Sequence, residues 1–198
     1  MKNKNRKIEF FKGYEDSWKY IKDIRNQIYL VLGIFFVFVL IGFFLPSPEG
    51  ISKYILQYIE DLLKLTKNFG AGDMFWFILF NNFKSSFLGM ILGTFFGVFP
   101  IWASLSNGYV LGFVASNVVA EEGASILFRL VPHGIFELPA IFISLGMGIK
   151  LGSCFFKKQK RYERFKENLK KSIKVFLLVV LPLLIVAAII ESLFMFFV

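Results

Sequence analysis

Cysteine and histidine are almost missing from this chain. Cys154 is the only cysteine and His133 the only histidine among 198 residues. A single cysteine excludes an intramolecular disulfide and a zinc site built from several cysteines. The GxSxG, HExxH and glycine-rich phosphate-loop motifs of common enzymes are also missing from the sequence. We therefore predict that the protein is not an enzyme and has no catalytic residue, no metal site and no cofactor.

Charged residues are scarce as well. They make up 19% of the chain, whereas 56% is hydrophobic and 27 residues are phenylalanine. Soluble domains contain about a quarter charged residues. Several apolar runs reach the roughly 20 residues that a helix needs to span a bilayer, and no β-barrel alternation is visible. These features predict an all-α, polytopic transmembrane bundle with about five membrane spans and amphipathic surface helices.

The basic residues, which give a net charge of +9, fall mainly in two blocks, residues 2–25 and 157–174. Basic blocks that flank apolar spans are typical of cytoplasmic loops, so the charge does not indicate nucleic-acid binding. We expect a multi-pass protein of the cell membrane with its N-terminus in the cytoplasm and its C-terminus outside. Residues 1–26 are predicted to form a cytoplasmic basic amphipathic segment, and residues 27–198 a single integral membrane domain.

Hydropathy and turn signals give the order of elements along the chain. In residues 1–26, one helix face carries Phe10, Tyr14, Trp18 and Ile21, which predicts a helix on the membrane surface. Residues 51–67 form a second amphipathic stretch, residues 74–80 a short or interfacial helix, and residues 104–108 a tight turn. The predicted spans are about 28–45, 85–103, 109–120, 133–152 and 175–198.

Small residues recur at helical spacing in two of these spans. Gly89, Gly93 and Gly97 form a doubled GxxxG pattern, which lets a neighbouring helix approach closely. In the fourth span, a face of small residues includes Gly148. We predict close helix packing at these four glycines, and a homodimer is the expected oligomer.

The most unusual stretch begins at Pro132. It places His133 and Glu137 one helical turn apart at the start of an apolar run. An ionisable side chain inside an apolar run is a functional-site hypothesis by default. The pair shares a face with Ala140, Ser144 and Gly148, and this face is expected to meet another helix. Residues expected to shape the helices are Pro132, Gly134, Pro139 and Gly108.

Three roles for the pair follow from its chemistry. It could relay protons or cations. It could bind a metal together with carboxylates such as Glu121, Glu122 or Glu191, although the chain has few nitrogen and sulfur ligands. Finally, it could join helices as part of a buried polar cluster in the outer half of the bundle. That cluster is predicted to contain His133, Glu137, Asn81, Asn82 and Asn107.

The run from Asn81 to Gly152 resembles the stage II sporulation protein M family, also known as DUF95. The resemblance rests on three motifs in the same order and spacing. They are Asn81-Asn82 before the glycine-rich span, Asn107-Gly108 with Gly112, and Pro132-His133-Gly134 followed by Glu137-Leu138-Pro139-Ala140. The resemblance implies an integral membrane protein that anchors a complex of partners and has no enzymatic activity of its own.

These observations leave three functions open. The first is a non-enzymatic membrane scaffold or envelope-remodelling component that assembles with membrane or envelope proteins. The second is a transporter or channel that uses the His/Glu/Asn polar layer. The third is a metal-dependent membrane enzyme. The bilayer itself is a partner in all three.

Overall fold

The chain is helical throughout the residues that the structure describes. The computed structural model describes the backbone of residues 2–156 and 159–197, and the side chains of residues 11–125, 134–156 and 159–194. The α-helices are α1 Lys2–Asp23, α2 Arg25–Phe44, α3 Glu49–Thr66, α4 Ala71–Leu92, α5 Val98–Glu122, α6 Leu127–Ser153, α7 Arg161–Val175 and α8 Leu181–Phe197. Short helical turns lie at η1 Ala124–Ile126, η2 Cys154–Phe156 and the π-helical η3 Phe176–Val180. The all-α prediction is confirmed.

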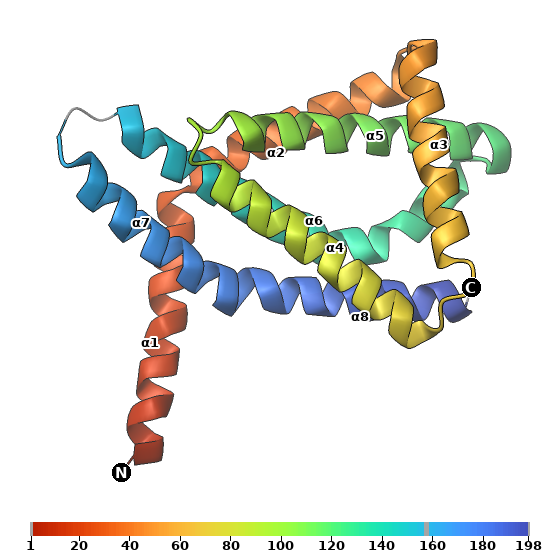
Figure 1. Cartoon of the computed structure of the whole chain (residues 1–198). Helices are drawn as coiled ribbons and strands as arrows, with labels where there is room; N and C mark the ends of the chain where they lie inside the picture. The colour runs from red at the N-terminus through yellow and green to blue at the C-terminus, as the bar shows by residue number, and fades with distance from the viewer. Residues whose placement is uncertain (1, 157–158, 198) are drawn as a thin grey trace.

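Five helical segments of the described chain are long and apolar enough to cross a membrane. They are Arg25–Phe44, Ala71–Leu92, Val98–Glu122, Gly134–Phe156 and Arg161–Phe194. Figure 1 shows α2 running beside α5, while α4, α6 and α8 form the rest of the bundle. Helix α3 lies across one end, and α1 projects away from the other end. The predicted number of spans is confirmed.

The boundaries predicted for the second and third spans are wrong. Residues 74–80 are part of α4, and the turn after α4 lies at Gly93–Gly97, not at residues 104–108. Phe96 and Gly97 adopt left-handed φ angles of 58° and 75°, which glycine tolerates best. Residues 104–108 lie inside α5 because Gly108 serves a close helix contact there. Glycine supports both turns and close contacts, so its position alone did not distinguish them.

Helices α2 and α5 are in backbone contact along a line that we call the α2–α5 seam. The hydroxyl of Ser104 donates a 2.6 Å hydrogen bond to the carbonyl of Val31. A side chain at Gly108 or Gly112 would overlap the backbone of α2. The facing pairs are Ser104 with Val31, Gly108 with Phe35, and Gly112 with Val39. Only small residues permit this approach.

Helix α6 packs against α4 through the predicted small face. Ala140, Ser144 and Gly148 are buried, as expected for a face that meets another helix. A side chain at Gly93 would overlap the backbone of Gly148, and one at Gly89 would come within 2.6 Å of Leu145. A side chain at Gly152 would likewise overlap Gly97 and Gly93. The four predicted packing glycines are therefore all used inside one chain, so they are not available as a dimer face.

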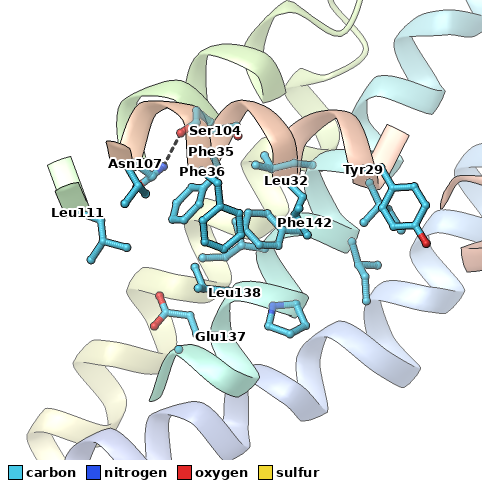
Figure 2. Close-up of a pocket in the computed structure, with 18 of the residues that line it drawn as sticks. Tyr29, Leu32, Phe35, Phe36, Ser104, Asn107, Leu111, Glu137, Leu138 and Phe142 are labelled. Carbon is cyan, nitrogen blue, oxygen red and sulfur yellow. Dashed lines mark hydrogen bonds between the residues drawn. The ribbon is translucent and has the colours of Figure 1, made fainter. Parts of the chain in front are cut away.

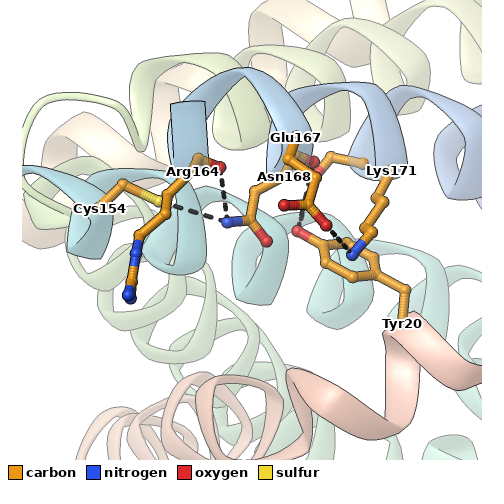
Figure 3. A network of polar contacts seen from close by, with 7 residues as sticks. Tyr20, Cys154, Arg164, Glu167, Asn168 and Lys171 are labelled. Carbon is orange, nitrogen blue, oxygen red and sulfur yellow. Dashed lines mark hydrogen bonds and ion pairs between the residues drawn. The ribbon is translucent and has the colours of Figure 1, made fainter. Parts of the chain in front are cut away.

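Helix α1 docks on α7 at the end of the bundle that carries both basic blocks. The Tyr20 hydroxyl lies 3.0 Å from the Ser172 hydroxyl and donates to the Asn168 carbonyl at 3.4 Å (Figure 3). Burial raises the pKa of Tyr20 to about 12. The buried residues of α1 are Gly13, Ser17, Tyr20 and Ile21, and Ile24 follows directly after the helix. Of the predicted aromatic face, Ile21 is buried in this contact, whereas Trp18 is 54% exposed.

Candidate functional site

A large cavity in the described part of the chain is a cleft between two walls of helices. Helices α2 and α5 form one wall, and the first half of the described part of α6 forms the other (Figure 2). Its volume is about 1430 Å³. Most of its lining is apolar, including Phe36, Leu111 and Leu138. We call this feature the α5–α6 cleft.

Part of the α2–α5 wall is a single stripe of side chains that continues from α1 into α2. Its residues follow alternating steps of four and three, the spacing of one face of a helix. In order they are Trp18, Lys22, Arg25, Tyr29, Leu32, Phe36, Val39 and Phe43. The stripe is cationic and aromatic at its start and wholly apolar after Tyr29. The helix break at Ile24 does not interrupt it, because Ile24 still bonds to Tyr20 and Ile28 still bonds to Ile24.

Two of the predicted polar residues lie in the cleft, on opposite walls. Figure 2 shows Glu137 on α6 and Asn107 on α5. Asn107 donates a 2.7 Å hydrogen bond to the Ala103 carbonyl of its own helix. Within the described side chains, none donates a hydrogen bond to the Glu137 carboxylate. The other carboxylate whose charge acts on Glu137 is Glu191 of α8.

The remaining members of the predicted polar cluster are not gathered in the cleft. Asn82 is buried on α4, and Asn81 beside it is exposed. The side chain of His133 lies outside the described residues, as does that of Pro132. The described residues thus bring Glu137 and Asn107 to one cavity and leave Asn81 and Asn82 elsewhere. Adjacent asparagines point to different sides of a helix, which explains why only one of them is buried.

Pro132, Gly134 and Pro139 lie inside α6, and none of them is its first residue. The helix begins at Leu127, five residues before Pro132. Pro139 has no backbone N–H, so the carbonyl of Ile135 lacks the donor that residue 139 would otherwise supply. Ile135 and Pro139 both line the cleft, and so does Gly134. This wall of the cleft therefore carries a backbone acceptor besides the Glu137 carboxylate.

These groups accept protons, hydrogen bonds or cations. Among the described side chains, no three His, Cys, Asp or Glu residues are close enough together to hold a metal ion. The described part of the cleft also contains no cysteine or serine placed beside a histidine. The expectation of a non-enzymatic protein without metal or cofactor stays a prediction.

Sequence reasoning missed two features that the structure reveals. The Ser104, Gly108 and Gly112 spacing is a small-xxx-small pattern, and it was hidden by the assignment of a turn to residues 104–108. The cleft stripe was hidden because residues 18–25 and 28–45 were treated as separate elements. Its signal is the four-three spacing, which continues through both.

Comparison with known proteins agrees with this architecture. Residues 31–194 match the family described as stage II sporulation protein M. The uncharacterized protein MJ0706 of Methanocaldococcus jannaschii is 28% identical over 174 residues, which cover 84% of this chain and 77% of that protein. The uncharacterized protein MJ0793 of the same organism is 29% identical over 119 residues, 58% of this chain and 66% of that protein. No solved structure matches the chain. Because the family match covers most of the sequence and its five apolar helices, the chain is a membrane protein that belongs to the stage II sporulation protein M family.

Proposed function

We propose that this protein is a non-enzymatic membrane scaffold that assembles with other membrane or envelope proteins. It resides in the cell membrane with its N-terminus in the cytoplasm and its C-terminus outside. The observation that carries the proposal is that most large apolar side chains of α3 are exposed and therefore available to a partner.

Helix α3 makes little use of its apolar residues within the chain. Ile55 is its only buried residue. The exposed large hydrophobic residues are Ile51, Tyr54, Leu56, Tyr58, Leu63 and Leu65. Tyrosine is one of the residue types enriched at the anchor positions of protein interfaces. Figure 1 shows α3 lying across one end of the bundle, and each of these side chains is at least 45% exposed there.

The basic blocks support the proposed orientation. Helices α1 and α7 dock on each other at the opposite end from α3, and Lys174 of α7 pairs with Asp16 of α1 at 2.9 Å. Positively charged flanks remain on the cytoplasmic side during insertion. In the proposed orientation α3 lies outside, where envelope components are found.

Photocrosslinking in native membranes tests the scaffold. A photoreactive amino acid at Tyr54, which is 73% exposed, should capture a specific protein. The matched control is Tyr162 of α7, which is 76% exposed at the other end. Capture from Tyr54 of a discrete protein species that Tyr162 does not give supports the proposal. Crosslinks from Tyr54 to lipid alone would contradict it.

The cleft favours a second candidate function, transport of a cation or proton. Glu137 presents a carboxylate to a membrane-depth cavity, and ionisable groups in spans often mark ion pathways. Flux into liposomes that contain the purified protein should then fall in Glu137→Gln. Equal flux in the wild type, the variant and empty liposomes would remove this function.

A further inference from the structure

We propose that the α5–α6 cleft is a binding site for an anionic phospholipid of the cytoplasmic leaflet. The lipid phosphate is held by Lys22 and Arg25, and an acyl chain lies along α2 between the two walls. This inference goes beyond the scaffold function and stands independently of it.

The cations lie where a phosphate needs them. Lys22 and Arg25 line one mouth of the cleft, and Trp18 lies one turn before them on the same stripe. Within the described side chains, neither cation has an ion pair within 4.0 Å. Tryptophan and basic residues are enriched at the level of lipid headgroups. Both cations are therefore available to an anion at this mouth.

The apolar part of the cleft has the length of an acyl chain in one leaflet. Eleven residues separate Arg25 from Phe36, and a helix rises 1.5 Å per residue, so the distance is about 16 Å. Half of a bilayer hydrocarbon core is about 15 Å. Tyr29, Leu32 and Phe36 line this length on α2, and Leu138 lines it on α6 (Figure 2). A lipid whose phosphate binds at Arg25 would thus end near the middle of the bilayer.

The cleft opens sideways, as entry from the bilayer requires. Tyr29 is 66% exposed, Phe36 is 49% exposed and Ile135 on the opposite wall is 58% exposed. Their lining positions and their exposure together define a slot between two walls, not a closed cavity. Lipid can therefore exchange with the membrane without passing through the bundle.

Charge disfavours a second copy of this chain as the occupant. A two-fold dimer uses the same surface on both subunits. A dimer closed through this cleft would bring a second Lys22 and a second Arg25 to the same depth in the membrane. Like charges at close range in a poorly solvated site repel each other. An anionic lipid instead neutralises the cations that are already present.

The test is native mass spectrometry of the full chain in detergent, titrated with phosphatidylglycerol or zwitterionic phosphatidylcholine. We expect the wild type to prefer phosphatidylglycerol. In the double variant Lys22→Gln/Arg25→Gln, the apparent affinity for phosphatidylglycerol should fall roughly thirtyfold. The reason is that each basic residue near anionic lipid contributes about 1 kcal/mol to binding. The control is Lys166→Gln/Lys170→Gln, which removes two exposed cations from α7 on the same predicted side. This control should keep wild-type affinity.

A second variant tests the acyl-chain part of the site. Leu111→Trp places a larger side chain in the apolar part of the cleft and leaves both cations in place. It should weaken phosphatidylglycerol binding but leave thermal stability unchanged. Glycerol phosphate, which has the same phosphate but no acyl chain, should not compete at millimolar concentration.

Three lipid-binding results, and one oligomerisation result, would overturn the proposal. One is equal binding of the two lipids, and another is wild-type affinity in Lys22→Gln/Arg25→Gln. The third is full competition by glycerol phosphate, which would identify a free phosphate site. A dimer that forms only when phosphatidylglycerol is absent would assign the cleft to a second copy instead.

Discussion

The two sides of α5 show opposite ways of facing another helix. On one side, Ser104, Gly108 and Gly112 bring α5 into backbone contact with α2. On the neighbouring face, Asn107, Val110 and Leu111 line a cleft of about 1430 Å³ between α5 and α6. The same helix thus forms a backbone contact on one face and part of a wide cleft on the next, and the difference follows from side-chain size. The seam residues recur every four positions, and the cleft residues lie on the neighbouring face of the helix, so a single helix carries both surfaces.

The comparison also explains why a membrane protein can keep such a cleft. In a bilayer, apolar side chains gain nothing from leaving lipid for a protein interior, so association depends on close packing and hydrogen bonds. The α2–α5 seam supplies both. The cleft supplies neither, and its apolar walls are satisfied by lipid chains. Stability and binding are therefore divided between the two faces of α5.

The largest effect is expected from Gly108→Val in the α2–α5 seam. A side chain here overlaps the backbone of Phe35, which cannot move independently of α2. The free energy of unfolding in mixed detergent micelles should fall by about 3 kcal/mol, the upper part of the range for overpacking. The matched control is Gly33→Ala on α2, where no atom lies within 4 Å. It should be neutral or slightly stabilising. Equal losses for the two variants would show that the seam is not close-packed.

Truncations in the core and the cleft should differ in cost. Leu184→Ala in α8 removes a fully buried side chain and is expected to cost about 3 kcal/mol of unfolding free energy. Leu138→Ala in the cleft should cost about 1 kcal/mol, because lipid fills the space that the side chain leaves. Both variants are measured by the same denaturant titration. A larger loss for Leu138→Ala than for Leu184→Ala would mean that the cleft is closed in the membrane.

The docking of α1 should contribute about 1 kcal/mol through Tyr20. Tyr20→Phe removes the hydroxyl that lies 3.0 Å from Ser172 and keeps the ring. The folded-state pKa of about 12 is above the ordinary value near 10, so folding favours the neutral phenol. Wild-type stability should thus fall relative to Tyr20→Phe as pH rises from 10 to 12. A pH-independent difference would place Tyr20 in contact with water. The same variant should weaken phosphatidylglycerol binding if α1 docking positions Lys22.

The smallest effect is expected from the two polar residues of α5 that lie three positions apart. Ser104 donates across the seam to α2, whereas Asn107 donates to its own helix. Ser104→Ala should lose about 0.6 kcal/mol, the average for a hydrogen bond between membrane helices. Asn107→Ala should leave stability unchanged within error, because its bond joins no second helix. Thermal melting of both variants in one detergent compares the two losses of stability. A larger loss for Asn107→Ala than for Ser104→Ala would contradict the assignment of the two faces.

Much of the architecture was predictable because its signals are local. Apolar runs predicted five spans, and the face of Ala140, Ser144 and Gly148 was correctly predicted to meet another helix. Span boundaries at Gly93–Gly97 and around Gly108 were not predictable, since both a left-handed turn and a close contact select glycine. The cleft was less predictable still. Glu137 was recognised by its chemistry, but its neighbours come from α5 and α8, which are distant in the sequence.

By itself, the sequence determined the membrane class, the all-α fold, the number of spans and the family, because hydropathy and helical periodicity are properties of single segments. Only the tertiary structure decided which helix each small residue meets. It assigned Gly93 to Gly148 and Gly108 to Phe35, and it left the line from Trp18 to Phe43 facing a cleft. A glycine specifies that a neighbour can approach, but not which one. That choice depends on the packing of all helices together, since each close contact fixes the space left for the others.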